Sequence, residues 1–237
     1  MKLDVSQLSK IIHNVLSYSF DEKGGLHFHR FSEAQSKTYA SEKQGWEVKT
    51  RSSASATFDF ITDSDSIALK YDLYPGSSRA WSAIDLYVDG VFYATRFAED
   101  HSIKLAGFEL PEGQHRVTVY FPWSAKIVVN EVHLSDGASV IPVEKKFKML
   151  CFGDSITQGY ISQYASLSYV NLTALALDAE GVNQGIGGYF FNETTIDESI
   201  LSYQPDVITV AYGTNDYSRR ETAEEYAQRS GRYIQKL

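Results

Sequence analysis

The chain has 237 residues and a formal net charge of −8, with 43% hydrophobic and 22% charged residues. These values are typical of a globular protein with one large or two small domains, and they exclude disorder along the whole chain. The basic residues are scattered along the sequence, which argues against nucleic acid or an anionic membrane as a partner.

The single cysteine, Cys151, allows no intrachain disulfide and gives no sign of an oxidising compartment. The N-terminal segment lacks the uninterrupted apolar core and small-residue cleavage site of a signal peptide. No run approaches the roughly 18 apolar residues of a membrane span. We therefore expect a cytoplasmic protein with no signal peptide in this chain.

Apolar residues at helical spacing predict an amphipathic helix over residues 5–17. From about Gly25 the pattern changes to short alternating runs, and Asp89-Gly90 between two of them is typical of a β-hairpin because both turn positions need positive φ. Strands are predicted at 55–61, 66–73, 83–88, 91–97, 116–121 and 127–134. Short strands without intervening helices predict an all-β sandwich, jelly-roll-like, over 25–135.

A polar stretch at 136–146 is the predicted linker, and strand–helix alternation begins after it. Strands are expected at 147–152, 181–184 and 207–212, and helices at 168–178, 195–203 and 222–237. Near-continuous apolar strands that alternate with helices predict a parallel sheet covered on both faces. The expected units are a helix with its lead-in at 1–24, the sandwich at 25–135, the linker, and an α/β region at 147–237.

The residues that follow the three predicted parallel strands should meet in one crevice, because ligands of open α/β sheets bind beyond the carboxyl ends of the strands. Each segment also has a purely structural explanation. Asp154 and Ser155 are common helix caps, a Gly-Gly pair suits a turn, and Asn215 suits an Asx turn. Together they supply a hydroxyl, flexible backbone amides and a side-chain amide, which are the groups that acyl transfer requires. These segments are 153–157, 183–188 and 213–216.

The same segments resemble three sequence blocks of the SGNH hydrolases, also called GDSL esterases and lipases. Gly-Asp-Ser-Ile-Thr at 153–157 is similar to the first block, 183–188 to the second, and 213–216 to the third. The resemblance implies that Ser155 is the nucleophile. It also implies that Gly188 and Asn215 donate hydrogen bonds to the oxyanion, with Gly185 or Gly187 as alternatives to Gly188.

By the same resemblance, Asp154 and Asp216 fix the loops around the nucleophile, and no metal or organic cofactor is needed. The implied fold is a three-layer, flavodoxin-like α/β sheet that is larger than the three strands found here, so we expect the sheet to be incomplete. In the family an Asp-x-x-His block supplies the catalytic base. All six histidines of this chain precede Ser155 and none lies in such a block, so we expect a C-terminally truncated and nearly inactive chain.

A β region followed by this catalytic half is similar in layout to two-domain carbohydrate esterases. We therefore expect a hydrolase that removes an acyl group from a carbohydrate or small-metabolite ester. The alternatives are an acyltransferase with the same site, and a non-catalytic carbohydrate-binding module with an inert hydrolase remnant. The oligomeric state is left open.

Three further sets of residues have alternative interpretations. Trp46, Trp81 and Trp123 are interpreted as sandwich core, with stacking on sugar rings as the alternative. The alternating histidines 27 and 29 are interpreted as an ordinary strand face rather than a metal site. Cys151, within an apolar strand, is expected to be buried and inert.

Overall fold

Three β-sheets form the body of the protein in this computed structural model, which describes residues 1–197, 200, 202–219 and 221–237. The first antiparallel sheet orders β1 (Ile12–His13), β4 (Thr57–Thr62), β9 (His115–Tyr120), β6 (Ser82–Val88) and β7 (Val91–Ala98), with β11 (Ile141–Pro142) beside β4. The second orders β2 (Ser17–Phe20), β3 (Leu26–His29), β10 (Ala125–Leu134), β5 (Ser66–Pro75) and β8 (Leu105–Glu109). The third sheet is parallel and orders β13 (Ala179–Gly185), β12 (Phe147–Gly153) and β14 (Val207–Ala211).

One hydrophobic core joins the two antiparallel sheets. Phe58 and Phe60 of β4 share it with Ile67 and Leu69 of β5, and all four side chains are fully buried. Two facing sheets over one core agree in outline with the expected sandwich, while the jelly-roll-like detail and the division into units stay predictions. The six strands predicted between 55 and 134 are confirmed with shifted ends, and so is the hairpin, where Asp89 and Gly90 have φ values of 50° and 78°.

The predicted helix over 5–17 is wrong in its extent. Helix α1 (Val5–Ser9) is short, Ile12 and His13 pair with β4, and β2 begins at Ser17. Leu8, Ile11 and Val15 of this segment are buried in the core that the antiparallel sheets share. The apolar spacing therefore predicted burial correctly but not helix. Instead, Ile12 and His13 pair with β4, and Asn14 has a φ of 62°, which an α-helix does not allow.

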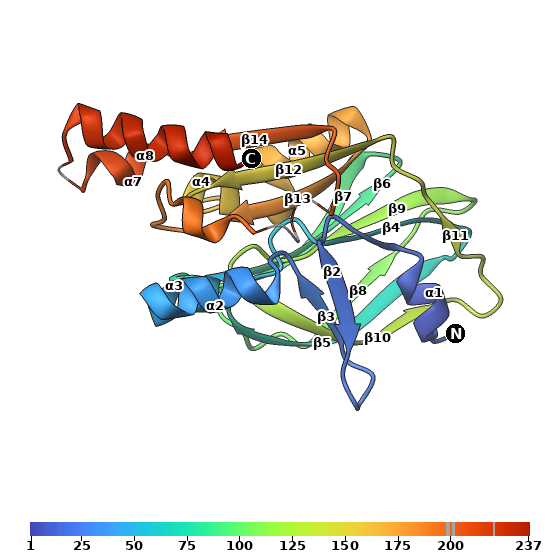
Figure 1. Ribbon diagram of the computed structural model, residues 1–237. Helices are drawn as coiled ribbons and strands as arrows, with labels where there is room; N and C mark the ends of the chain where they lie inside the picture. Colours follow the sequence, from blue (N-terminus) through green and yellow to red (C-terminus); the bar gives the residue numbers. More distant parts are fainter. Residues whose placement is uncertain (198–199, 201, 220) are drawn as a thin grey trace.

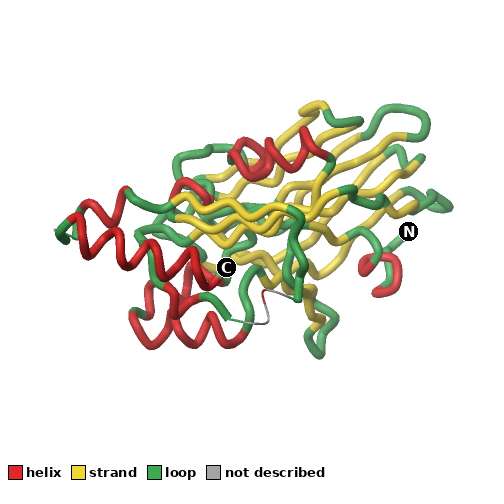
Figure 2. Tube along the Cα trace, turned by 45° about the horizontal axis from the view of Figure 1, so that its top comes forward, coloured by secondary structure: helices red, strands yellow, loops and turns green. Residues whose placement is uncertain are grey.

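Two helices, α2 (Glu33–Glu42) and α3 (Gln44–Thr50), interrupt the segment expected to be all β. Ser32 and Gln35 form a capping box at the start of α2, a signal that the sequence does contain. Apolar side chains are few in both helices, so periodicity hardly marks them. In Figures 1 and 2 these helices lie at the same end of the molecule as α7 (Thr214–Tyr217) and α8 (Ala223–Lys236).

Helices cover both faces of the parallel sheet, as predicted. Val170 of α5 (Tyr169–Leu177) packs against Met149 and Cys151 on one face, and Tyr233 of α8 packs with Leu150 on the other. Cys151 is fully buried, which confirms that part of its interpretation. The predicted helix over 195–203 falls partly outside the described residues. Among the described helices, none has the length and apolar character needed to cross a membrane.

A partly buried ion-pair network, centred on the buried carboxylate of Asp59, links the antiparallel sheets to the α/β region. Arg116 of β9 donates to Asp59 of β4 over 2.9 and 2.8 Å and to Asp178, at the end of α5, over 2.8 Å. Lys145, from the predicted linker, also binds Asp59, whose exposed fraction is 1%. Burial alone would raise the pKa of Asp59, but Arg116 and Lys145 outweigh it and hold the pKa below 3.8.

We expect Asp59→Ala to lower the free energy of unfolding by about 3 kcal/mol, because it leaves Arg116 and Lys145 without their main partner. Asp72→Ala, which removes an exposed pair with Lys104, should cost less than about 1 kcal/mol. Since the folded pKa of Asp59 is depressed, its contribution should be complete above about pH 5 and should fade as the pH drops below about 3.9. Urea unfolding of both variants between neutral and acidic pH measures this. Equal losses for the two variants would contradict the role of the network.

Candidate active site

Ser155 begins the short helix α4 (Ser155–Gln158) directly after β12. Asp154 caps this helix, since its Oδ1 accepts the Ile156 N–H over 2.9 Å. Burial raises the pKa of Asp154 and the Asp216 carboxylate raises it further, against the hydrogen bond from Ile156. The Ser155 side chain is partly buried, and its hydroxyl has no hydrogen-bond partner among the described residues.

Two glycines let the strand ends approach the backbone of α4. A Cβ at Gly185 would lie 2.2 Å from the Gln158 amide nitrogen, and one at Gly153 would lie 2.0 Å from Thr157 Oγ1. No other residue fits either position without displacement of its neighbours. The glycines of the first two predicted segments thus serve a close contact that holds α4 against the sheet.

Gly185→Ala should push α4 off the end of β13 and lower the free energy of unfolding by about 2–3 kcal/mol, the usual cost of overpacking. Gly107→Ala is the matched control, because a Cβ there meets nothing within 4 Å. Urea unfolding of the two variants gives the comparison. If Gly185→Ala were as stable as Gly107→Ala, the proposed close approach would be wrong.

Of the three glycines considered as oxyanion donors, Gly188 is the one with an unused N–H. The Gly185 N–H donates to Asn183 Oδ1 and the Gly187 N–H to Gln158 Oε1, each over 2.9 Å. Gly188 is exposed at a φ of 84°, and its N–H has no partner within the described part of the chain. The geometry thus favours Gly188 over the two alternatives that the sequence left open.

Asn215 of α7 connects the other two segments. Its Nδ2 donates to the Tyr189 carbonyl over 2.9 Å and lies 3.4 Å from Asp154 Oδ2. These contacts are made to the immediate neighbours of Gly188 and Ser155. The structure therefore brings the three predicted segments together at the carboxyl end of the parallel sheet.

Asp216 is buried beside this junction, with an exposed fraction of 2%. Its Oδ1 accepts the Phe191 N–H over 3.2 Å and a hydrogen bond from Arg229 over 2.7 Å. These bonds tie the loop after Gly188 to helix α8. Such an arrangement suits the expected part of Asp216, which is to hold loops rather than to contact a substrate.

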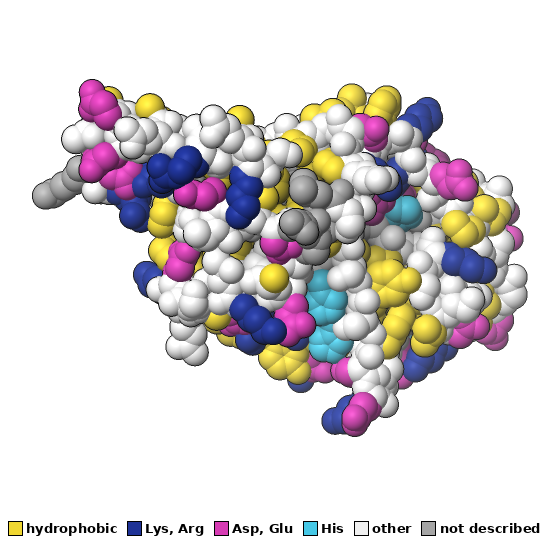
Figure 3. Space-filling model, viewed as in Figure 1, with side chains coloured by type: hydrophobic (Ala, Val, Ile, Leu, Met, Phe, Trp, Pro, Cys, Tyr) yellow, Lys and Arg dark blue, Asp and Glu magenta, His cyan; other side chains and the backbone are white. Residues whose placement is uncertain are grey.

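None of the six histidine rings is hydrogen-bonded to Ser155 in the described structure. Five bind partners elsewhere: His13 with Glu180, His27 with Asp21, His29 with Ser19, His115 with Asp89 and His133 with Glu131. His101 Nε2 is buried without a partner among the described residues. The histidines visible in Figure 3 lie away from the end that carries α7 and α8.

Helix α3 places two residues, Trp46 and Lys49, beside Gly188, which the sequence alone did not predict. A Cβ at Gly188 would lie 3.8 Å from Trp46 Nε1 and 3.9 Å from Lys49 Nζ, and Lys49 Nζ donates to the Gly187 carbonyl. The interpretation of Trp46 as sandwich core is wrong, since its ring packs edge-on against Tyr189 at 5.0 Å. Trp46 lies on a helix that was not predicted and contacts a loop more than 140 residues further along the chain, so this contact has no local sequence signature.

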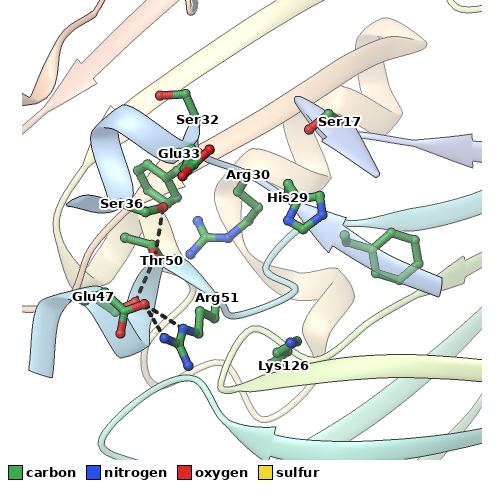
Figure 4. A pocket seen from close by; sticks show the side chains of 12 residues that line it. Ser17, His29, Arg30, Ser32, Glu33, Ser36, Glu47, Thr50, Arg51 and Lys126 are labelled. Atoms are coloured by element: carbon green, nitrogen blue, oxygen red, sulfur yellow. Dashed lines mark hydrogen bonds and ion pairs between the residues drawn. The ribbon is translucent and has the colours of Figure 1, made fainter. Parts of the chain in front are cut away.

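Two cavities lie close to this end of the molecule. An open groove of about 790 Å³ runs between α7 and the start of α8; its lining includes Gly213, Asp216, Tyr217 and Tyr226. A pocket of about 460 Å³, shown in Figure 4, lies between β3 and helices α2 and α3; its lining includes His29, Arg30, Thr50, Arg51 and Lys126. The groove is lined by Gly213 and Asp216, which lie close to Asn215 in sequence, whereas none of the three strand-end segments lines the pocket.

Comparison with known proteins agrees with this arrangement. Residues 151–237 match the model of the GDSL-like Lipase/Acylhydrolase family, the family that the sequence blocks resemble. None of the curated proteins compared with the sequence matches it.

Solved structures share the fold over nearly the whole chain at low sequence identity. A salicylyl-acyltransferase from a tetracycline biosynthetic pathway is 19% identical with a TM-score of 0.78, over 95% of this chain and 65% of its own. A putative GDSL-like lipase from Bacteroides ovatus is 17% identical with a TM-score of 0.74, over 100% and 70%. A family two carbohydrate esterase from Cellvibrio japonicus is 20% identical with a TM-score of 0.65, over 97% and 72%. The chain thus spans about two thirds of the length of these proteins and has a GDSL-like α/β fold accompanied by antiparallel sheets.

Proposed function

We propose that this chain carries the nucleophile and the oxyanion donors of a carboxylic ester hydrolase. The observation that supports this most is the junction at Asn215, which contacts the residues next to both Ser155 and Gly188. The Ser155 hydroxyl and the Gly188 N–H, which adjoin these two contacts in sequence, have no partner among the residues that the structure describes. Acyl transfer needs these groups at one place.

In the proposed reaction the Ser155 hydroxyl attacks the ester carbonyl carbon and passes its proton to a base. The carbonyl oxygen becomes an oxyanion, which accepts hydrogen bonds from the Gly188 N–H, the Ser155 N–H and Asn215. One Asn215 amide proton is used by Tyr189, while the other makes only the long 3.4 Å contact with Asp154 and remains for the oxyanion. Collapse releases the alcohol with a proton and leaves an acyl-serine, which water then hydrolyses to acid and free serine.

The proposed substrate is an acyl ester of a carbohydrate or small metabolite. Carbohydrate esterases among the structures of similar fold support the carbohydrate part. The similarity to a salicylyl-acyltransferase supports acyl transfer to another alcohol as a second candidate. The two reactions share the acyl-serine and differ only in whether water or an alcohol attacks it.

A boronic acid tests the site without requiring turnover. The Ser155 hydroxyl should add to phenylboronic acid with release of a proton, and the resulting tetrahedral boronate anion resembles the intermediate. Boron-11 NMR and mass spectrometry should show an adduct that Ser155→Ala abolishes. Asn215→Ala should weaken the adduct by about tenfold or more, because a donor to the anion is lost. Absence of an adduct, or an adduct that survives Ser155→Ala, would refute the proposed site.

A further inference from the structure

Two cations from the N-terminal region bind the carbonyl groups of the segment that ends at Gly188. Arg30, in the loop after β3, donates to the carbonyls of Asn183 and Gly185, and Lys49 of α3 donates to that of Gly187. Three alternate carbonyls of the same segment therefore face positive charge. We call Arg30 and Lys49 the cation clamp.

Arg30 also ties the clamp together. Its remaining N–H groups donate to Lys49 O over 2.9 Å, and to Ser52 O and Ser52 Oγ over 2.8 and 2.7 Å. All five guanidinium N–H donors are thus used, each by a neutral acceptor. Figure 4 shows the guanidinium directed from the end of β3 toward the end of α3. The loop after β3, helix α3 and the glycine segment are held by this one side chain.

The charges of the clamp are not neutralised nearby. Within the described residues, no carboxylate forms an ion pair with either Arg30 or Lys49, although Arg30 is fully buried. Burial lowers the pKa of Arg30 to about 9 and also lowers the pKa of Lys49. The five hydrogen bonds of Arg30 offset part of the cost of burying its charge, and its positive charge remains unneutralised by any carboxylate of the described residues. A developing oxyanion nearby would be stabilised by the same charges.

The orientation of one peptide links Lys49 to the reaction. The Gly187–Gly188 peptide is trans, as no cis peptide occurs in the described chain, so its C=O and N–H point in opposite directions. With the carbonyl bound to the Lys49 ammonium, the Gly188 N–H is turned away from α3. A charge-assisted bond at the oxygen also polarises the peptide and makes its N–H a stronger donor.

We propose that Lys49 is a positioning residue of the oxyanion site, which orients and polarises the Gly188 N–H from a helix outside the segment matched by the family. This proposal rests on the proposed function. It assigns part of the catalytic apparatus to residues 30–49 and predicts that the α/β region alone would hold its oxyanion loop poorly. In this proposal Lys49 acts only through the Gly187–Gly188 peptide.

The test compares Lys49→Met, which keeps the length and removes the charge, with Lys49→Arg, which keeps both charge and donor. Lys37→Met, an exposed lysine on α2, is the matched control. Affinity for phenylboronic acid should fall about tenfold in Lys49→Met, less than the 10²–10³ typical of losing a donor itself. It should stay within about threefold of the unaltered chain in the other two variants. Equal affinity in Lys49→Met, or a loss in Lys49→Arg as large as in Lys49→Met, would overturn the proposal.

The Gly188 amide signal in ¹H–¹⁵N spectra gives a readout that does not depend on adduct formation. It should shift upfield in the proton dimension in Lys49→Met and stay near its original position in Lys49→Arg, with urea unfolding confirming that each variant folds. If the unaltered chain forms no boronate adduct, the proposed function fails, and this signal still decides whether Lys49 polarises the peptide. An unchanged Gly188 signal in folded Lys49→Met would refute the proposal that Lys49 polarises this peptide, and would leave the proposed function untouched.

Discussion

The chain of 237 residues should hydrolyse an activated acetyl ester only slowly, and Ser155→Ala should change that rate by less than about threefold. A serine hydroxyl is a weak nucleophile near neutral pH and needs a base within hydrogen-bond reach. No histidine follows Ser155 in this sequence, and no described histidine ring bonds to it. What remains is catalysis by the oxyanion donors and by binding, roughly 10³–10⁴ over water in serine hydrolases that lack a triad member.

A rate-versus-pH series on the chain and on Ser155→Ala measures this. A chain in which an Asp-x-x-His block follows these residues should be faster by about 10³-fold or more, and should lose that gain on Ser155→Ala. Fast turnover of the present chain with an apparent pKa near roughly 6.5–7, abolished by Ser155→Ala, would contradict the prediction. A histidine of the antiparallel region, or one from a second copy, would then be the base.

Asn215→Ala should lower the slow hydrolysis by about 10²-fold, which brings it close to the rate in buffer. The expected cause is the loss of the neutral hydrogen-bond donor that we propose for the oxyanion. The measurement is the initial rate of activated acetyl ester hydrolysis, corrected for the reaction without protein. The two substitutions should therefore differ in size of effect: little change for Ser155→Ala and a large loss of rate for Asn215→Ala.

Asn130→Ala is the control, since Asn130 also binds a protein acceptor, Asp72 Oδ2 over 2.9 Å, but on a distant strand. Because Asn215 also holds the Tyr189 carbonyl, urea unfolding must show that the variant remains folded. A folded Asn215→Ala protein with an unchanged rate would show that this amide is not an oxyanion donor. The slow hydrolysis would then have another origin.

The sequence by itself determined the strand-end segments that carry Ser155, Gly188 and Asn215. These motifs are local, and parallel strands joined by helices must end at the same edge of the sheet. The strands of the antiparallel region were also predictable, because alternation of apolar residues reports a half-buried strand directly. The helix over 5–17 was not, because apolar spacing reports burial but not the hydrogen-bond partners of the backbone. At Ile12 those partners lie on β4, more than forty residues away in the chain.

Only the tertiary structure decided which glycine N–H has no partner among the described residues, and which side chains bind the carbonyl groups next to it. Gly185 and Gly187 look equivalent to Gly188 in sequence, and the difference lies in Asn183 and Gln158, which use up their N–H groups. Lys49 reaches Gly187 across 138 residues of sequence, and Arg30 reaches Asn183 across 153. Such contacts have no local signature, because they depend on how the antiparallel sheets and α3 pack against the end of the parallel sheet.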